Sequence, residues 1–208
     1  EEGTETISEV SHTLLYDKRD SVISPTEGYF LRIINDLAGL GGSTQYIRNR
    51  LKGSQFFPLA DQWVLSVTAS AGQIIGLGED VRLLDRFFVG GDNLRGFATS
   101  GIGPRDALTE DALGSEWMYT ASAEISFPFG LPAELGLTGK IFTDLGSAGK
   151  INPSGPDVND EISLRASIGT GIVWASPFGP VGMDFGVPIL KENFDEVENV
   201  RVSFGTKF

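Results

Sequence analysis

Apolar and polar residues alternate with a period of two along most of this sequence, and this pattern restricts the fold more than any other feature. In the segment 162–174, Leu164, Ile168 and Ile172 share one face, while Arg165 and Ser167 share the other. Successive side chains of a β-strand point to opposite faces, whereas a helical pattern repeats roughly every 3.6 residues. The chain is therefore predicted to be all-β.

Clusters of Gly, Pro, Asp or Asn divide the sequence into strand-like segments. Nine segments are predicted, at 7–16, 28–37, 44–57, 62–74, 115–127, 135–145, 162–175, 181–188 and 198–208. Short Pro-containing turns at 24–28, 57–61, 128–132 and 176–180 alternate with more polar or longer links at 38–43, 75–114, 146–161 and 189–197. Short turns at one end and longer loops at the other are typical of an antiparallel up-and-down barrel in an outer membrane. About eight or nine strands are expected in such a barrel.

The composition leaves two classes of β protein open. Of the 208 residues, 40% are hydrophobic, and the mean hydropathy is −0.01. A soluble β-sandwich or ligand-binding barrel would give this value, and so would a transmembrane barrel whose lipid-facing and lumen-facing residues average out. The net charge of −12 argues against nucleic acid as a partner, because phosphate binding requires clustered Lys and Arg. The absence of a basic, apolar leader indicates a removed signal peptide or an internal piece of a longer chain.

The distribution of aromatic residues favours the membrane barrel. The apolar face ends in aromatic side chains, which form girdles at membrane interfaces. These are Trp63, Tyr119, Phe127, Trp174 and Phe208. The opposite face is polar, charged or glycine, and in 44–57 it carries Arg48, Arg50 and Lys52. We therefore expect the apolar face to meet lipid and the polar face to line the interior.

Four stretches of the sequence carry a family resemblance. Residues 16–20 and 25–28 read Tyr-Asp-Lys-Arg-Asp and Pro-Thr-Glu-Gly; residues 87–97 read Phe-Phe-Val-Gly-Gly-Asp-Asn-Leu-Arg-Gly-Phe, followed by Ile-Gly-Pro-Arg-Asp at 102–106. Residues 169–180 read Gly-Thr-Gly-Ile-Val-Trp-Ala-Ser-Pro-Phe-Gly-Pro, and the chain ends Phe-Gly-Thr-Lys-Phe. In this order they resemble the BamA-type outer-membrane proteins of the bacterial surface antigen family. The second stretch is similar to the Arg-Gly-Phe/Tyr loop shared by BamA, TamA and the two-partner secretion transporters.

This resemblance implies both an architecture and a function. Residues 1–208 would be the C-terminal portion of a BamA-like barrel, about half of it, without POTRA domains. The implied function is to fold and insert β-barrel proteins into the bacterial outer membrane, without a cofactor, metal or enzymatic step. The implied partners are nascent outer-membrane proteins, outer-membrane lipid and lipopolysaccharide, accessory assembly lipoproteins, and a second copy joined through open strand edges. A passive channel or two-partner secretion translocator is the alternative, because it shares the arginine motif.

The resemblance also implies a loop-anchoring site. The loop arginine matches Arg95, followed by Gly96 and Phe97, and its acidic partners match Glu124 and Asp144. The alternation agrees, since Ile125 and Phe127 assign odd positions to the apolar face and leave Glu124 inward; Ile141 and Leu145 do the same for Asp144. A planar guanidinium can bridge two such carboxylates.

The last predicted strand carries the second set of candidate residues, Phe204, Gly205 and Phe208. The terminal aromatic resembles an outer-membrane targeting signal, and a glycine within a strand weakens pairing or permits a kink. In the family, substrates enter at the seam between the first and last strands. Because bacterial barrels have even strand numbers, we expect either a partial first strand or association of two copies.

Other polar residues give weaker candidates. His12 is the sole histidine, so a lipid hydrolase would depend on it as the base; an ordinary strand position is expected instead. The acidic run Glu192, Asp195, Glu196 and Glu198, and the group Asp106, Glu110 and Asp111, are expected to be solvated loop residues rather than cation sites.

Overall fold

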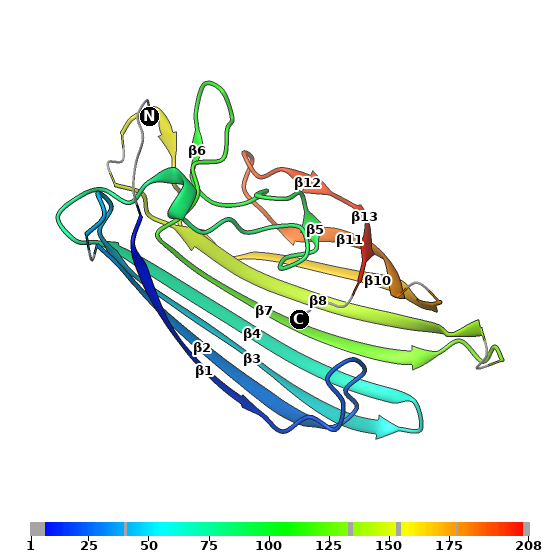
Figure 1. Ribbon diagram of the computed structural model, residues 1–208. Coiled ribbons are helices and arrows are strands. Elements are labelled where there is room, and N and C mark those ends of the chain that lie inside the picture. Colours follow the sequence, from blue (N-terminus) through cyan, green and yellow to red (C-terminus); the bar gives the residue numbers. More distant parts are fainter. Residues whose placement is uncertain (1–6, 40, 133–134, 153–154, 178, 206–208) are drawn as a thin grey trace.

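One antiparallel sheet forms most of the molecule. The computed structural model describes residues 7–39, 41–132, 135–152, 155–177 and 179–205. The sheet has nine strands in the order β1-β2-β3-β4-β7-β8-β10-β11-β13. Figure 1 shows that the strands lie side by side and bend around a concave inner side. No helix in the described ranges is long and apolar enough to cross a membrane.

The strands follow the predicted segments in number and order, with shifted ends. They are β1 (Glu9–Asp17), β2 (Gly28–Ala38), β3 (Tyr46–Ala60), β4 (Trp63–Gly76), β7 (Trp117–Pro128), β8 (Leu137–Gly149), β10 (Arg165–Ser176), β11 (Gly179–Leu190) and β13 (Val200–Phe204). Neighbours in the sheet pair in antiparallel register, as an up-and-down meander requires. The predicted fold class is confirmed.

Two predicted turns are wrong in extent. The segment 57–61 was expected to be a turn, but β3 continues to Ala60 and a register shift lies between Pro58 and Ala60. An irregularity of this kind tolerates a proline, which has no N–H to donate to the ladder. The chain then reverses at Asp61 and Gln62, with Gln62 at a φ of 60°. The turn expected at 176–180 is likewise shorter, since the strands reach Ser176 and resume at Gly179.

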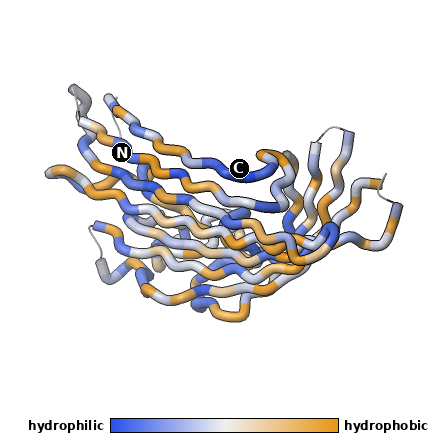
Figure 2. The backbone as a smooth tube through the Cα atoms, turned by 90° about the horizontal axis from the view of Figure 1, so that it is seen from below, coloured by the Kyte–Doolittle hydropathy of each residue, from blue (hydrophilic) through white to orange (hydrophobic). Residues whose placement is uncertain are grey.

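The two faces of the sheet differ as expected for a barrel wall. Outward side chains such as Leu31, Ile141 and Val202 are exposed, whereas the inward carboxylates of Asp36 and Asp144 are buried. Figure 2 shows the resulting alternation of hydropathy along the strands. An apolar outer face and a charged inner face are the inverse of a soluble sandwich, so the sandwich alternative is excluded.

The long links, and the start of the last predicted segment, contain short separate elements that the alternation of residues does not indicate. These are the 3-10 helix η1 (Leu83–Asp85) and the strands β5 (Gly96–Phe97), β6 (Arg105–Asp106), β9 (Val158–Asn159) and β12 (Val197–Glu198). β5 pairs with β12, and β6 pairs with β9. β5 packs against β10 and β11, which places it on the inner side of the sheet (Figure 1).

The first and last strands of the sheet are its edges. Within the described residues, β1 pairs only with β2, and β13 pairs only with β11. The expectation of a partial first strand is wrong, because β1 pairs with β2 from Glu9 to Asp17 without a register shift.

Candidate functional site

The link between β4 and β7 (residues 77–116, hereafter the arginine loop) folds into the concave side of the sheet. Four of its buried apolar residues form a cluster with Ala148 of β8, namely Val89, Leu94, Phe97 and Ile102. Asn93 supports the bend by accepting a hydrogen bond from the Gly90 N–H at 2.8 Å. The loop is therefore packed against the wall by its own hydrophobic residues, with Arg95 between Leu94 and Phe97.

Arg95 binds the carboxylate of Asp144 on β8 through both its guanidinium and its backbone N–H. Its Nε donates to Oδ2 and its Nη2 donates to Oδ1, both at 2.7 Å, and its backbone N–H also donates to Oδ2 at 3.0 Å. Arg95 and Asp144 are 7% and 1% exposed. Bidentate, charge-assisted contacts of this kind fix orientation as well as position. The loop backbone and the arginine head are thus both bound to one inward carboxylate.

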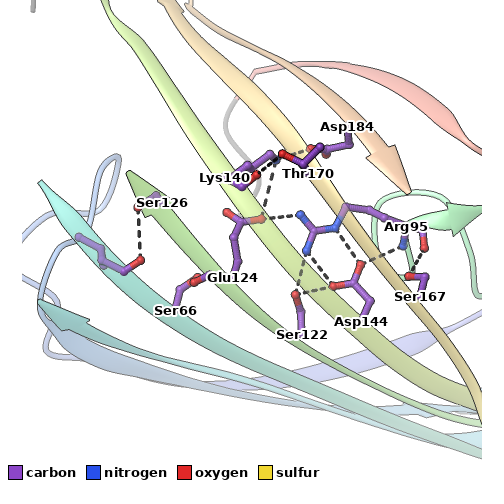
Figure 3. A network of polar contacts seen from close by, with 11 residues as sticks. Ser66, Arg95, Ser122, Glu124, Ser126, Lys140, Asp144, Ser167, Thr170 and Asp184 are labelled. Carbon is purple, nitrogen blue, oxygen red and sulfur yellow. Dashed lines mark hydrogen bonds and ion pairs between the residues drawn. The ribbon is translucent and has the colours of Figure 1, made fainter. Parts of the chain in front are cut away.

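Two residues of β7 complete the shell around the guanidinium (Figure 3). Arg95 Nη1 donates to Glu124 Oε2, and Nη2 donates to Ser122 Oγ at 2.9 Å. The Ser122 hydroxyl in turn donates to Asp144 Oδ1 at 2.6 Å. The structure therefore brings together Arg95, Glu124 and Asp144, the three charges named from the sequence.

Gly96 allows the loop backbone to approach the wall. It has a φ of 90°, and a Cβ built there would lie 3.1 Å from the Cβ of Ser167 on β10. Ser167 donates from Oγ to the Arg95 carbonyl oxygen. Phe97 is fully buried in the loop cluster. A side chain at position 96 would disturb both the backbone conformation and the hydrogen bond from Ser167 to the Arg95 carbonyl.

Three further residues belong to the site, although the sequence analysis did not name them. Phe142 of β8 lies beneath the guanidinium, with 3.5 Å between Arg95 Cζ and the ring centroid. Lys140 of β8 pairs with Asp184 of β11, with 2.7 Å from Nζ to Oδ1, and lies 3.8 Å from Glu124 Oε2. All three lie at strand positions whose parity points inward, and this parity is the sequence feature that could have pointed to them. Parity alone does not show which inward residues meet.

A second set of contacts joins the arginine loop to the segment leading into the last strand. Beyond the β5–β12 ribbon, the Ala98 N–H donates to the Glu196 carbonyl, and the Glu196 N–H donates to the Gly101 carbonyl. The Arg201 guanidinium on β13 contacts Glu198 and donates to Thr99 Oγ1 at 2.9 Å. The loop therefore connects the β7–β8 wall to β13.

The expectation of a solvated acidic run is wrong for Asp195, which is buried, whereas Glu196 is exposed. Asp195 and Arg165 form a buried pair, in which Nε lies 3.0 Å from Oδ2, and both side chains are 0% exposed. Glu196 Oε1 accepts from Arg105 Nη1 at 2.9 Å, and Glu198 contacts Arg201. Each of these three acids neutralises an arginine, which sequence spacing does not reveal. Among the described residues, no acidic group has the geometry of a metal site.

The group at 106–111 supports its own turn. Asp106 Oδ1 accepts backbone hydrogen bonds from Leu108 and Thr109 at 2.9 and 2.8 Å. The Glu110 carbonyl accepts from the buried Arg105, and the Asp111 carbonyl accepts from the Asp106 N–H.

His12 occupies an ordinary strand position. It is exposed on β1 opposite Asn35, and in the described part of the chain its side chain has no hydrogen-bond or ion-pair partner. A hydrolase triad built on His12 has no support from this geometry.

The closing strand differs from its predicted extent. β13 ends at Phe204, which is 79% exposed on the outer face. Gly205 was expected within the strand; instead it has a φ of 89°, and its N–H donates to the Pro180 carbonyl at 2.9 Å. Phe208 lies outside the described residues.

Comparison with known proteins assigns the chain to a family. The family model described as the Omp85 superfamily domain matches residues 1–208. The chain belongs to the Omp85 superfamily. It is 36% identical over 208 residues to the outer membrane protein assembly factor BamA of Neorickettsia risticii, and the match spans 99% of this chain and 28% of that protein. It is also 30% identical over 145 residues to the sorting and assembly machinery component 50 homolog of Mus musculus, over 68% of this chain and 30% of that one.

Solved structures support the same assignment within the Omp85 superfamily. The crystal structure of BamA from Haemophilus ducreyi lacking POTRA domains 1–3 superposes with a TM-score of 0.85 and 25% identity, over 96% of this chain and 42% of that one. The predicted family is therefore confirmed. The chain spans less than a third of the length of the two relatives named above.

Proposed function

We propose that this chain is the C-terminal barrel portion of a bacterial outer-membrane protein assembly factor, which folds and inserts other β-barrel proteins. Relatives with assembly names in both a bacterium and a mouse support this proposal. The observation that carries it is the attachment of the arginine loop, through Arg95, to the carboxylates of Asp144 and Glu124. A passive channel or translocator shares the arginine motif, so the assembly names of the relatives are what favour the assembly function over that alternative.

The proposed activity is mechanical and electrostatic rather than covalent. The buried Arg95 contacts hold the loop on the β7–β8 side, and the β5–β12 ribbon holds the segment that leads into β13. Within the described residues, β13 pairs with β11 over five positions, from Val200 to Phe204. An exposed strand edge can pair with an incoming strand by β-augmentation. The loop would set the position of this edge while an incoming strand pairs with it.

We propose the following partners for the whole protein. Nascent outer-membrane proteins would be the clients, and outer-membrane lipid and lipopolysaccharide would contact the exposed apolar face. Accessory assembly lipoproteins would bind at the periplasmic side. The edges at β1 and β13 offer pairing to a further strand, from the same polypeptide or a second copy. In this proposal Phe204 and Phe208 serve as the aromatic targeting signal, and no step needs a cofactor or an enzymatic group.

A folding assay in lipid vesicles tests the proposal. The full-length protein is reconstituted, a urea-unfolded eight-stranded barrel is added as client, and folded client is followed by its shifted mobility on an unboiled gel. We expect faster client folding than in empty vesicles, and slower folding with the Arg95→Ala variant. Ion conductance without any acceleration of client folding would contradict the proposal and favour a passive channel or translocator.

A further inference from the structure

The inner wall, as far as the structure describes it, contains two cations that lack acidic partners, in contrast to its other charges. Asp36 Oδ2 lies 2.9 Å from Arg48 Nε and 2.7 Å from Arg50 Nη2. The Arg95 group, Arg165 and Arg201 are also paired with carboxylates. Arg32 of β2 and Lys52 of β3 are the exception, because neither forms a hydrogen bond or ion pair with any residue in the described ranges.

Arg32 and Lys52 are also forced to face one another. They are direct partners in the β2–β3 register, and both have the inward parity of Asp36 and Ser54. Like charges directly opposite each other in a sheet are destabilising. Arg32 interacts electrostatically with the carboxylate of Asp17, but that carboxylate is bound to Arg19, with 2.7 Å between Arg19 Nη2 and Asp17 Oδ2. Both cations are half-buried, so water replaces the missing anion only in part.

A cavity opens directly over this pair. It measures about 400 Å³, and its lining includes Arg32, Lys52 and Arg19. The same cavity is lined by apolar side chains, namely Phe30 and Phe56 of the wall and Ile23 of the β1–β2 turn. Ile23 is 71% exposed. Five basic residues line the cavity against two acidic ones, Asp92 and Glu124. Phe30 is buried, so the apolar surface left open in the cavity comes from Phe56 and Ile23.

The cavity lies toward the end of the sheet that carries the short turns. The β1–β2 turn lines it through Val22, Ile23 and Pro25, and Pro180, next to the β10–β11 turn, also lines it. In outer-membrane barrels the short turns face the periplasm and the longer loops face the exterior. Unfolded polypeptides reach such a barrel from the periplasmic side, whereas lipid contacts its outer, apolar face.

We propose that this cavity binds an acidic, partly apolar segment of an incoming polypeptide. Carboxylates would supply the anions that Arg32 and Lys52 lack, and neighbouring aliphatic or aromatic side chains would cover Phe56 and Ile23. The choice of a client segment as occupant rests on the proposed function, whereas the preference for an acidic, apolar ligand rests on the cavity alone. Electrostatic recognition of this kind weakens with ionic strength.

A peptide-binding measurement tests this proposal separately from client folding. The full-length protein is reconstituted in vesicles of zwitterionic lipid and titrated against a dansyl-labelled peptide of ten alternating Glu and Leu residues, read by fluorescence anisotropy. The matched probe is the same peptide with Gln for Glu. We expect the acidic peptide to bind at least tenfold more tightly than the Gln peptide, and its binding to weaken as salt is added.

Variants assign the binding to the two cations. The double variant Arg32→Gln/Lys52→Gln should bind the acidic peptide at least tenfold more weakly, while Lys191→Gln, which removes an exposed cation outside the cavity, should bind like the unmodified protein. Heat-shifted gel mobility identifies the variants that have folded. Equal binding by a folded double variant, or by the Gln peptide, would overturn the proposal.

Three further outcomes are decisive. Displacement of the peptide by inorganic phosphate at matching concentrations would show a simple anion site and overturn the peptide proposal. Binding by residues 1–208 but not by the full-length protein would show that the protein's own chain fills the cavity, which also overturns it. If the unmodified full-length protein does not accelerate client folding but still binds the acidic peptide, the proposed assembly function is contradicted, whereas the ligand preference of the cavity stands.

Discussion

Arg95 and Asp144 are 49 residues apart in the sequence, and three hydrogen bonds join them. Two of these bonds come from the guanidinium and one comes from the backbone N–H of the same residue. Asp144 therefore fixes both the side chain and the path of the loop. This double attachment distinguishes the pair from an ion pair that involves side chains alone.

The Arg95→Ala variant should lose loop order and stability. It leaves Asp144 buried without its cation, and removing one partner of a buried pair costs about 3–5 kcal/mol. Arg95→Lys should be intermediate, because an ammonium cannot repeat the bidentate geometry. The free energy of unfolding, from urea titrations in micelles, measures this. Equal stability of the Lys variant and the unmodified protein would show that bidentate geometry is unimportant here.

The Lys140–Asp184 pair should show strong coupling in a double-mutant cycle. Both side chains are almost fully buried, at 7% and 2% exposure. Lys140→Met alone leaves a buried carboxylate, and Asp184→Leu alone leaves a buried ammonium. The double variant removes both charges, so it should be more stable than either single variant. Additive effects of the two substitutions would mean that the pair contributes no interaction of its own.

Asp195→Asn should be far more harmful than Glu192→Gln, although both lie in the same acidic run. The substitution at position 195 would leave the fully buried Arg165 without its carboxylate, with an expected loss of about 3–5 kcal/mol. Glu192 contacts Asp195 through its backbone, whose N–H donates to Asp195 Oδ2 and whose carbonyl accepts from the Asp195 N–H, so the Glu192 side chain provides a matched control. Thermal melting should place the Glu192 variant close to the unmodified chain and the Asp195 variant well below it. Equal melting temperatures for the two variants would contradict a buried role for Asp195.

Asp20 should keep its charge to unusually low pH. Hydrogen bonds from the Thr26 hydroxyl and from the backbone of Glu27 and Thr26 lower the pKa of Asp20 from 3.8 to about 2. Because the pKa falls on folding, the added stability of the 18–27 turn is present above about pH 4 and is lost as the pH falls through about 2. The carboxyl carbon chemical shift, followed by NMR, reports this titration. Thr26→Val should raise the pKa, while a midpoint near 4 in the unmodified chain would contradict the assigned contacts.

Much of the wall could be predicted from the sequence, because its determinants are local. The period of two assigns faces without any knowledge of neighbours, and it placed Glu124 and Asp144 inward. Glycine and proline clusters marked the turns to within a few residues. The exact ends depended on pairing, which is why β3 passes through Pro58 and β8 continues to Gly149.

The remaining features depend on contacts between distant segments. Phe142, Lys140 and Asp184 have inward parity like many other residues, and only the register of β8 and β11 beside the loop shows that they join one network. The ion pairs of Asp195, Glu196 and Glu198 could not be predicted from the sequence, because their arginine partners lie on the distant strands β6, β10 and β13. Charge patterns in a loop do not indicate which wall the loop will meet.

The most direct test of the central claim is amide hydrogen exchange of the arginine loop, measured in the full-length protein and in its Asp144→Asn variant. If the inner wall holds the loop, peptides containing Arg95–Phe97 should be protected in the unmodified protein and exchange much faster in the variant, with protection of β3 and β4 unchanged. Rapid exchange of these peptides in the unmodified protein, or equal protection in both, would contradict a loop anchored by Arg95.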